Sequence, residues 1–409
     1  MTMQTIESGD RVTAIRAPSS LSARVSVLAA LAAVGTFATN ILLPSLPSMA
    51  KALNVSTAAV SSTISVYLAV FAIGQLIVGP LSDRYGRWKP VVFGLGIFVA
   101  GTIWCEFSTT LPMMLVGRTI QALGACAASV LSRAIARDLL SGEELTKALA
   151  FIMVAMSAAP GFSPLIGGLL DTTFGWRSEF VVVGLFGAIV ALTYYRYVGE
   201  THRPDGKVSI HLPAILRGYW GLMTDLRFIA PAATIGLFMG AIFAMFSVSP
   251  RILIDGLGFS PIQLGLFFAG TVFVVFAAGM TAPRLAIRIG HGRATLVGLV
   301  IATLGGALLL LAHWATPTIW SYLIPVTIFL AGFSLVSPLA TATTLQPFGD
   351  KAGLASALLG FLQMAGAALG VTLTASIASA TLAVGSVQAA LTMLGLMLYL
   401  TGQRASSAR

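Results

Sequence analysis

Long apolar runs are the feature that most constrains this chain. They recur along its whole length, and each has the roughly 20 residues that a helix needs to cross a bilayer core of about 30 Å. Of the 409 residues, 57% are hydrophobic and only 9% are charged, whereas a soluble domain carries about 25% charged residues. The sequence therefore predicts an all-α membrane protein and argues against a soluble globular fold.

Polar segments divide the apolar sequence into twelve predicted transmembrane helices. The predicted spans are residues 24–46, 58–80, 90–108, 112–135, 147–170, 179–198, 228–250, 262–282, 293–313, 318–342, 353–378 and 383–402. The longest polar stretch follows the sixth span and separates two groups of six. The predicted organisation is a tail at 1–22, a six-helix half at 23–198, a linker at 199–227, a second half at 228–403 and a tail at 404–409.

Positive charge alternates between the two sides of the predicted membrane protein. Twenty of the 24 Lys and Arg residues lie in tails and loops on one side, three (Lys51, Arg177 and Arg251) lie on the other, and Arg118 lies within a span. The positive-inside rule then places both termini in the cytoplasm. The same distribution accounts for the net charge of +10 without a nucleic-acid partner. We read the polar first 22 residues as a cytoplasmic tail, because no short apolar segment with a cleavage site precedes the first span.

The two halves repeat one another. Residues 84–87 (RYGR) follow the second span, residues 288–291 (RIGH) follow the eighth at an offset of 204, and Gly94 matches Gly298 in the same register. Two parallel repeats related by an axis along the membrane normal are typical of transporters, whose substrate site lies between the halves near the midplane. The sequence therefore predicts a transporter with a central site.

Several motifs resemble those of a known family. Residues 79–87 (GPLSDRYGR) resemble the signature loop of the major facilitator superfamily, residues 118–124 (RTIQALG) its fourth-helix motif, and residues 163–168 (SPLIGG) its antiporter motif, with Ser163 in place of the usual glycine. Further runs resemble the bicyclomycin/chloramphenicol resistance (Bcr/CflA) drug-efflux subgroup. These runs are residues 43–47, 175–180, 249–250, 346–348 and 352–363. The resemblance implies a drug-efflux transporter of the bacterial inner membrane with two six-helix halves.

The resemblance also implies a charge network of Asp83, Arg87 and Asp138 that holds the cytoplasmic side closed while the outer side is open. The candidate gating residues are Gly79, Asp83, Arg84, Gly86, Arg87 and Asp138. Partly dehydrated charges that compensate one another are costly to separate singly, and the two glycines permit a close backbone approach. The alternative is an ordinary loop with solvated charges.

Arg118 is the leading candidate for substrate binding, because an intramembrane arginine is costly and by default functional. Asn40 on the first span is expected near the same depth, and Gln121 lies one helical turn away. The alternative for Arg118 is a purely structural role, hydrogen-bonded to helix carbonyls. The other residues expected to line a mostly apolar pocket are Tyr67, Gln75, Phe243, Met245, Phe246 and Gln363.

Proton coupling lacks its expected carboxylate. The Bcr/CflA pattern usually has an aspartate in the first span where this chain has Asn40, and no acidic residue lies in the middle of a predicted span. Arg118, Glu106 and Glu179 remain as proton-coupling candidates. A cationic substrate is disfavoured, because the cavity would offer it Arg118 and no counter-charge. Separately, Pro160, Pro164, Gly167 and Gly168 are expected to bend the fifth span and shape the moving interface.

The sequence thus predicts a secondary transporter that exports small, neutral or anionic drug-like compounds by alternating access, as a proton antiporter and a monomer. The alternative within this class is a dedicated exporter or importer of one metabolite or natural product, or a uniporter. An enzyme would need a paired acid and base, a metal cluster or an activated nucleophile, and no such set is present. A channel would need polar rings along a pore. No cofactor is expected.

Overall fold

The computed structural model describes residues 21–201 and 212–407, and within these ranges all regular structure is helical. Twelve of its helices or helix pairs are long and apolar enough to cross a membrane, which confirms the predicted fold class and number of spans. The first group comprises α1 (Leu21–Asn40), η1 (Leu43–Ser45), α2 (Leu46–Ala52), α3 (Thr57–Val60), α4 (Ser62–Tyr85), α5 (Trp88–Glu106), α6 (Leu111–Leu139), α7 (Gly142–Phe174) and α8 (Arg177–Tyr197).

The remaining helices form a second group, preceded by a helix within the polar linker. They are α9 (Leu212–Thr224), α10 (Leu226–Pro250), η2 (Arg251–Gly256), α11 (Pro261–Gly279), α12 (Ala282–Ile289), α13 (His291–Leu311), η3 (Ala312–Trp314), α14 (Ile319–Leu345), η4 (Gln346–Lys351), α15 (Ala352–Ala375) and α16 (Ala380–Ser407). The parts of the predicted tails and linker at residues 1–20, 202–211 and 408–409 lie outside the described residues.

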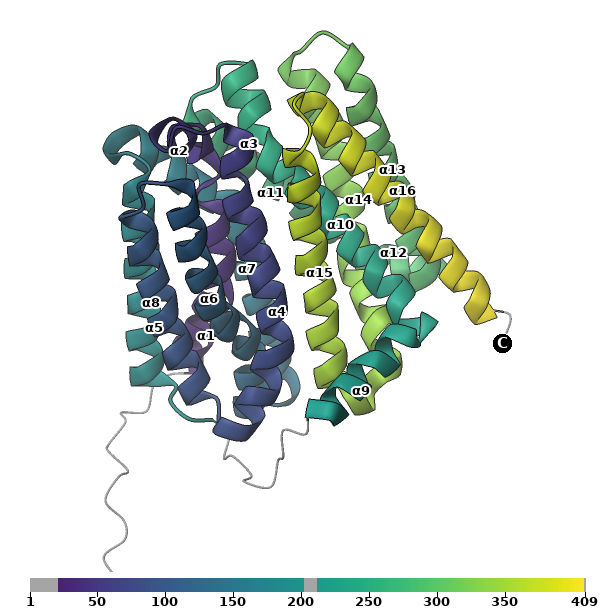
Figure 1. The fold of residues 1–409 in the computed structure, drawn as a ribbon. Helices are drawn as coiled ribbons and strands as arrows, with labels where there is room; N and C mark the ends of the chain where they lie inside the picture. The colour runs from purple at the N-terminus through teal and green to yellow at the C-terminus, as the bar shows by residue number, and fades with distance from the viewer. Residues whose placement is uncertain (1–20, 202–211, 408–409) are drawn as a thin grey trace, which may run out of the picture.

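The two groups stand side by side, with α4 of the first packed against α15 of the second (Figure 1). We call the end of the bundle that carries the 85–88 turn and α9 the linker face. The opposite end, with the turns at 53–56 and 257–260, we call the far face. Residues 21 and 407 begin α1 and end α16 at the linker face (Figure 1).

The internal repeat appears in backbone geometry as well as in sequence. Gly86 and Gly290 end equivalent helices with φ of 83° and 84°, a conformation that favours glycine. Gly94 lets α5 approach the Gly124 carbonyl on α6, and Gly298 lets α13 approach the Gly332 carbonyl on α14. The predicted offset of 204 residues is therefore a structural repeat.

Helix starts at the far face follow the same repeat. Ser56 and Ser260, also 204 residues apart, accept a hydrogen bond from a first-turn N–H group of α3 and α11. Thr110 and Thr318 do the same for α6 and α14. Such caps satisfy backbone donors that have no partner within the helix.

The far face is closed where α7 crosses α11. A Cβ at Gly168 would collide with the Pro261 carbonyl, and a Cβ at Gly265 would collide with the backbone of Leu165. Small residues at both positions allow the backbones to touch. The two halves therefore meet without space between them at this level.

The linker helix α9 ties the second half to the first. Pro80 has no N–H group, so the Leu76 carbonyl on α4 loses its donor four residues ahead. The Tyr219 hydroxyl of α9 donates to that carbonyl at 3.1 Å. Burial raises the pKa of Tyr219 to about 12, so the hydroxyl keeps its proton and remains a donor.

We predict that Tyr219→Phe lowers the free energy of unfolding by about 1–3 kcal/mol, because it leaves a partly buried carbonyl without a donor. Thermal unfolding of the purified protein measures the effect. Tyr85→Phe is the control, because Tyr85 is 48% exposed. Equal midpoints for the wild type and Tyr219→Phe would show that the bond contributes nothing.

Candidate functional site

A cavity of about 440 Å³ lies between the two halves. Its walls come from α1, α4, α6 and α7 of the first half and from α10, α11, α14 and α15 of the second. The lining reaches Arg137 in the last turn of α6 and Leu345 at the end of α14, both toward the linker face. The cavity is therefore accessible from the linker face and closed toward the far face, where α7 and α11 touch.

The cavity wall is mainly apolar and combines two kinds of side chain. Its aromatic and methionine residues are Tyr67, Phe71, Phe243, Phe246, Phe333, Met153, Met156, Met239 and Met364. Phe243 and Phe246 pack edge to face with centroids 5.7 Å apart. Aromatic rings offer rigid contact area, whereas methionine adapts to irregular shapes, so this wall suits apolar molecules of varied outline.

The structure divides the predicted substrate-binding residues into two sets. Tyr67, Phe243, Phe246 and Gln363 line the cavity. Arg118, Asn40 and Gln121 are fully buried and are not among the lining residues. Met245, on the same helix as the two phenylalanines, is also buried outside the cavity.

Arg118 lies behind Tyr67. Its guanidinium carbon is 4.2 Å from the centroid of the Tyr67 ring. Nη1 donates to the Ala38 carbonyl at 3.1 Å and to Gln121 Oε1 at 2.5 Å, and Nε donates to the Thr63 carbonyl at 3.4 Å. Arg118 thus joins α1, α4 and α6 and reaches the cavity only through the Tyr67 ring.

Asn40 is held by its own helix. Its Nδ2 donates to the Thr36 carbonyl at 2.8 Å, while the buried Oδ1 has no hydrogen-bond partner among the described residues. The α1 residues that line the cavity are Gly35, Thr36 and Thr39, which precede Asn40 by one to five residues. The part of α1 predicted to line the cavity does so, but through these residues and not through Asn40.

Two glutamines line the cavity, Gln75 on α4 and Gln363 on α15. Gln75 on α4 donates to the Gly360 carbonyl on α15 at 3.1 Å, and a Cβ at Gly360 would collide with the Gln75 amide. Gln363 follows one turn later on α15. Gln75 therefore links the two halves at the cavity wall.

Two arginines that line the cavity were not predicted to do so. From the sequence alone they were counted only among the twenty basic residues on one side of the membrane. Arg133 lies inside α6 and Arg137 one turn later, and both line the cavity. Helical phase was the available signal, because 15 residues bring Arg133 to within about 60° of Arg118 on the helical wheel. No acidic side chain lines this cavity among the described residues.

The predicted gating residues meet at the linker face. Arg87 Nη1 donates to Asp83 Oδ1 at 2.7 Å, Arg87 Nε donates to Asp138 Oδ2 at 3.0 Å, and Nη1 also reaches Ser82 Oγ. Burial disfavours the Arg87 charge, but the bonds and charges of Asp138 and Asp83 outweigh it and raise the pKa of Arg87 above its ordinary value. The network joins α4 to α6 within the first half while the cavity remains accessible from the linker face.

The glycines and Arg84 of this loop differ in their surroundings. The Glu200 carboxylate accepts hydrogen bonds from the Arg87 and Trp88 N–H groups at 2.8 and 3.1 Å, and a Cβ at Gly86 would collide with it. A Cβ at Gly79 would meet no heavy atom within 4 Å. The expected close approach is therefore found at Gly86 and not at Gly79. Arg84 is exposed, with its guanidinium 5.5 Å from the Tyr85 ring.

The acidic proton-coupling candidates lie toward the far face. Glu179 is fully buried, accepts a hydrogen bond from Ser45 Oγ through Oε1, and has no partner for Oε2 among the described residues. Ser48 Oγ donates to the neighbouring Asp171 at 2.7 Å. Glu106 is half-buried at the end of α5. None of these acids lines the central cavity.

The residues expected to bend the fifth span lie within one continuous helix, α7. Pro160 lines the cavity, and Pro164 follows one turn later. A Cβ at Gly167 would collide with the Ile41 carbonyl, and Gly168 meets α11 as described above. These residues therefore lie where α7 passes from the cavity wall to the closed far face.

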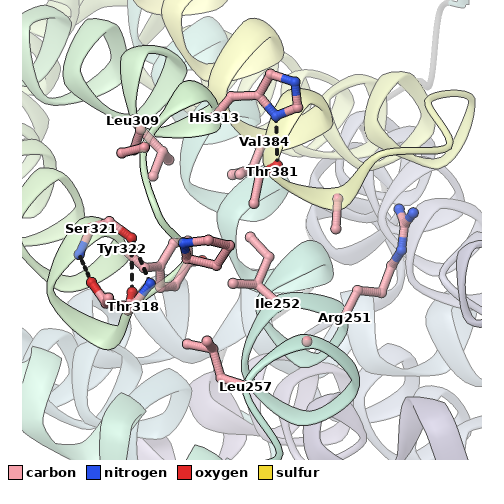
Figure 2. Close-up of a pocket in the computed structure, with 15 residues that line it drawn as sticks. Arg251, Ile252, Leu257, Leu309, His313, Thr318, Ser321, Tyr322, Thr381 and Val384 are labelled. Atoms are coloured by element: carbon pink, nitrogen blue, oxygen red, sulfur yellow. Dashed lines mark hydrogen bonds between the residues drawn. The ribbon is translucent and has the colours of Figure 1, made fainter.

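A second cavity of about 230 Å³ lies within the second half at the far face (Figure 2). His313 Nδ1 is 2.8 Å from Thr381 Oγ1 on one side of it, and Tyr322 and Ile252 lie on the others (Figure 2). Its lining comes from the second half alone. Within residues 21–201 and 212–407, no group of three or more His, Cys, Asp or Glu side chains could hold a metal ion. The central cavity is therefore the candidate site.

The two carboxylates of the charge network differ in burial, so we expect them to contribute differently to stability. The Asp138 side chain is 18% exposed and the Asp83 side chain 52%. We expect Asp138→Asn to cost about 1.5–3 kcal/mol of stability, the range for a hydrogen bond to a charged group. Asp83→Asn should cost under about 1 kcal/mol, as for an exposed pair. Thermal unfolding distinguishes them, and a larger effect at Asp83 would contradict the ranking.

Comparison with known proteins agrees with this geometry. Multidrug resistance protein D of Escherichia coli (strain K12) is 29% identical over 386 residues, covering 91% of this chain and 93% of that protein. A bicyclomycin resistance protein homologue of Haemophilus influenzae is 28% identical over 355 residues, covering 86% and 88%. These relatives agree with the resemblance to the Bcr/CflA subgroup that the sequence motifs indicated.

The fold is also that of solved transporters. A crystal structure of a bacterial homologue of the human lysosomal transporter Spinster matches with a TM-score of 0.73 at 15% identity, covering 94% of this chain and 97% of that one. The family model described as Major Facilitator Superfamily matches residues 28–371. The chain is a transporter with twelve spans and belongs to the major facilitator superfamily.

Proposed function

We propose that this protein exports small, neutral or anionic drug-like compounds across the bacterial cytoplasmic membrane by alternating access, in exchange for protons. The observation that carries the proposal is the central cavity, which both halves line, which extends to the linker face, and which ends toward the far face where α7 packs against α11. A site that opens to one side between two packed halves is what alternating access requires. The partners are the substrate, protons and the lipid bilayer, and the transporter acts as a monomer.

The positive-inside rule supports a cytoplasmic linker face with both termini inside. The cavity then takes substrate from the cytoplasm. Its lining carries Arg133 and Arg137 and no acidic residue among the described residues, which disfavours cations. The mixture of aromatic and methionine side chains suits several substrates rather than one.

Two further roles follow from this orientation. Glu179 takes up and releases the coupling proton, because a buried intramembrane carboxyl group without a cationic partner is typical of proton relays. The Asp83–Arg87–Asp138 network stabilises the cytoplasmic ends of α4 and α6 as one unit. This unit moves against the second half when the cavity closes to the cytoplasm.

The alternative is a dedicated transporter of one metabolite or natural product, or a uniporter. The absence of a carboxylate at Asn40 favours it, since the first span then offers no proton site. Transport assays separate the two functions.

Proteoliposomes test substrate class and coupling together. We expect chloramphenicol (neutral) and nalidixate (anionic) to be transported several-fold faster than the permanent cation ethidium, and an imposed pH gradient to increase the rate. Glu179→Gln should abolish the increase and retain exchange without a gradient, whereas Glu106→Gln should retain both. Equal rates with and without the gradient would exclude antiport, and faster transport of ethidium would refute the substrate class.

Alternation itself is tested at the far face. Ser337 lines the cavity, and the native Cys105 and Cys126 are buried. Ser337→Cys should react with a membrane-impermeant maleimide from the linker side. Adding Gly168→Val should reduce the labelling rate several-fold, because the added side chain collides with Pro261 and opposes closure of the far face.

The matched control is Gly270→Val on α11, where a Cβ meets no heavy atom within 4 Å. Unchanged labelling with Gly168→Val, or an equal decrease with Gly270→Val, would contradict alternation at this contact.

A further inference from the structure

Arg133 and Arg137 are cations on the cavity wall without anionic partners. Arg133 Nη1 contacts Met156 Sδ at 3.9 Å. Within the described parts of the chain, neither arginine forms an ion pair. Asp138, the acid next in sequence, is bonded to Arg87 and to Thr201.

Two unpaired arginines one turn apart leave hydrogen-bond donors unused and repel each other. A guanidinium has five N–H donors, and a thioether sulfur is a weak acceptor. Like charges one helical turn apart repel each other and destabilise a helix. An anion bound between the two side chains would satisfy the free donors and offset the repulsion.

The buried arginine deeper in the same helix does not compete for this role. Arg118 is fully buried and donates to two helix carbonyls and Gln121, and its Nη2 is buried without a partner among the described residues. The Tyr67 ring lies between Arg118 and the cavity, so a molecule in the cavity does not reach this guanidinium. Arg133 lies 15 residues further along α6, about 22 Å toward the linker face. A molecule entering the cavity from the linker face therefore meets Arg137 and Arg133 before it reaches the level of Arg118.

We propose that Arg133, assisted by Arg137, forms an anion-binding subsite for the carboxylate, sulfonate or phosphate group of an amphiphilic substrate. The planar guanidinium of Arg133 binds such an oxyanion in bidentate fashion. The apolar body of the substrate lies along Met156, Phe71 and the Phe243–Phe246 pair, which line the same cavity. The subsite rests on the proposed transport function, and it assigns the anionic substrates to a specific place.

Matched pairs of ligands test the subsite in lipid-free detergent. The probes are 2-naphthoate, indole-3-acetate and 4-phenylbutyrate, each compared with its primary carboxamide. We expect the carboxylates to bind the wild type at least tenfold more tightly than the amides, by ligand-induced thermal stabilisation. Arg133→Gln should reduce the difference to within twofold, Arg133→Lys should retain part of it, and Arg137→Gln should reduce it less.

Two variants control the experiment. Arg196→Gln removes a linker-face charge that does not line the cavity and should leave the preference unchanged. Met156→Glu places a carboxylate beside Arg133 and should abolish the preference without deleting the arginine. This second variant keeps the test decisive where Arg133→Gln lowers the yield of folded protein.

Three outcomes would overturn the subsite: no carboxylate preference in the wild type, a preference that survives both Arg133→Gln and Met156→Glu, or an equal loss with Arg196→Gln. Added phosphatidylglycerol tests whether the natural anion is a lipid headgroup. If this lipid completely displaced every carboxylate, the assignment of the subsite to a substrate would also be overturned. Binding needs no transport. A carboxylate preference without transport in proteoliposomes would therefore contradict the proposed function alone.

Discussion

The structure depends on one constraint, which is that backbone polar groups in hydrocarbon must be satisfied within the protein. Long helices satisfy most of them, and side chains bond some of the groups left over at helix ends and at a proline. The Leu76 carbonyl, left without a donor by Pro80, is bonded by Tyr219 of the linker helix. The free N–H groups at the start of α5 are bonded by Glu200, which follows α8. Both sets of hydrogen bonds hold the linker segment against the linker face.

Charge within the bundle is accommodated in three ways. Arg118 is surrounded by helix carbonyls and the Tyr67 ring, and Arg87 is paired with Asp83 and Asp138. Arg133 has neither and faces the cavity. The first arrangement fastens helices together, the second stabilises the linker face of one half, and the third leaves binding capacity for a ligand. Three arginines of the first half thus take three different roles.

The internal repeat shows which features are architectural and which belong to one half. The turn glycines Gly86 and Gly290 and the packing glycines Gly94 and Gly298 are duplicated, because both halves need the same turn and the same close helix contact. Asp83, one of the two acids of the network, is not duplicated, since it corresponds to Ile287, which is 85% exposed. The charge network is therefore an addition to one half of a duplicated scaffold.

By itself, the sequence determined the twelve spans, the repeat and the family, because span length, hydropathy and motif spacing are local properties of the chain. It also identified Tyr67, Phe243, Phe246 and Gln363, which line the cavity. It did not reveal that Arg118 lies behind Tyr67, that Arg133 faces inward, or that part of the polar linker forms α9. Those facts depend on how eight helices rotate and pack around a shared space. Most side chains on every face of these helices are apolar. The sequence pattern therefore does not specify which face meets lipid, a neighbouring helix or the cavity. Only the tertiary packing decides it.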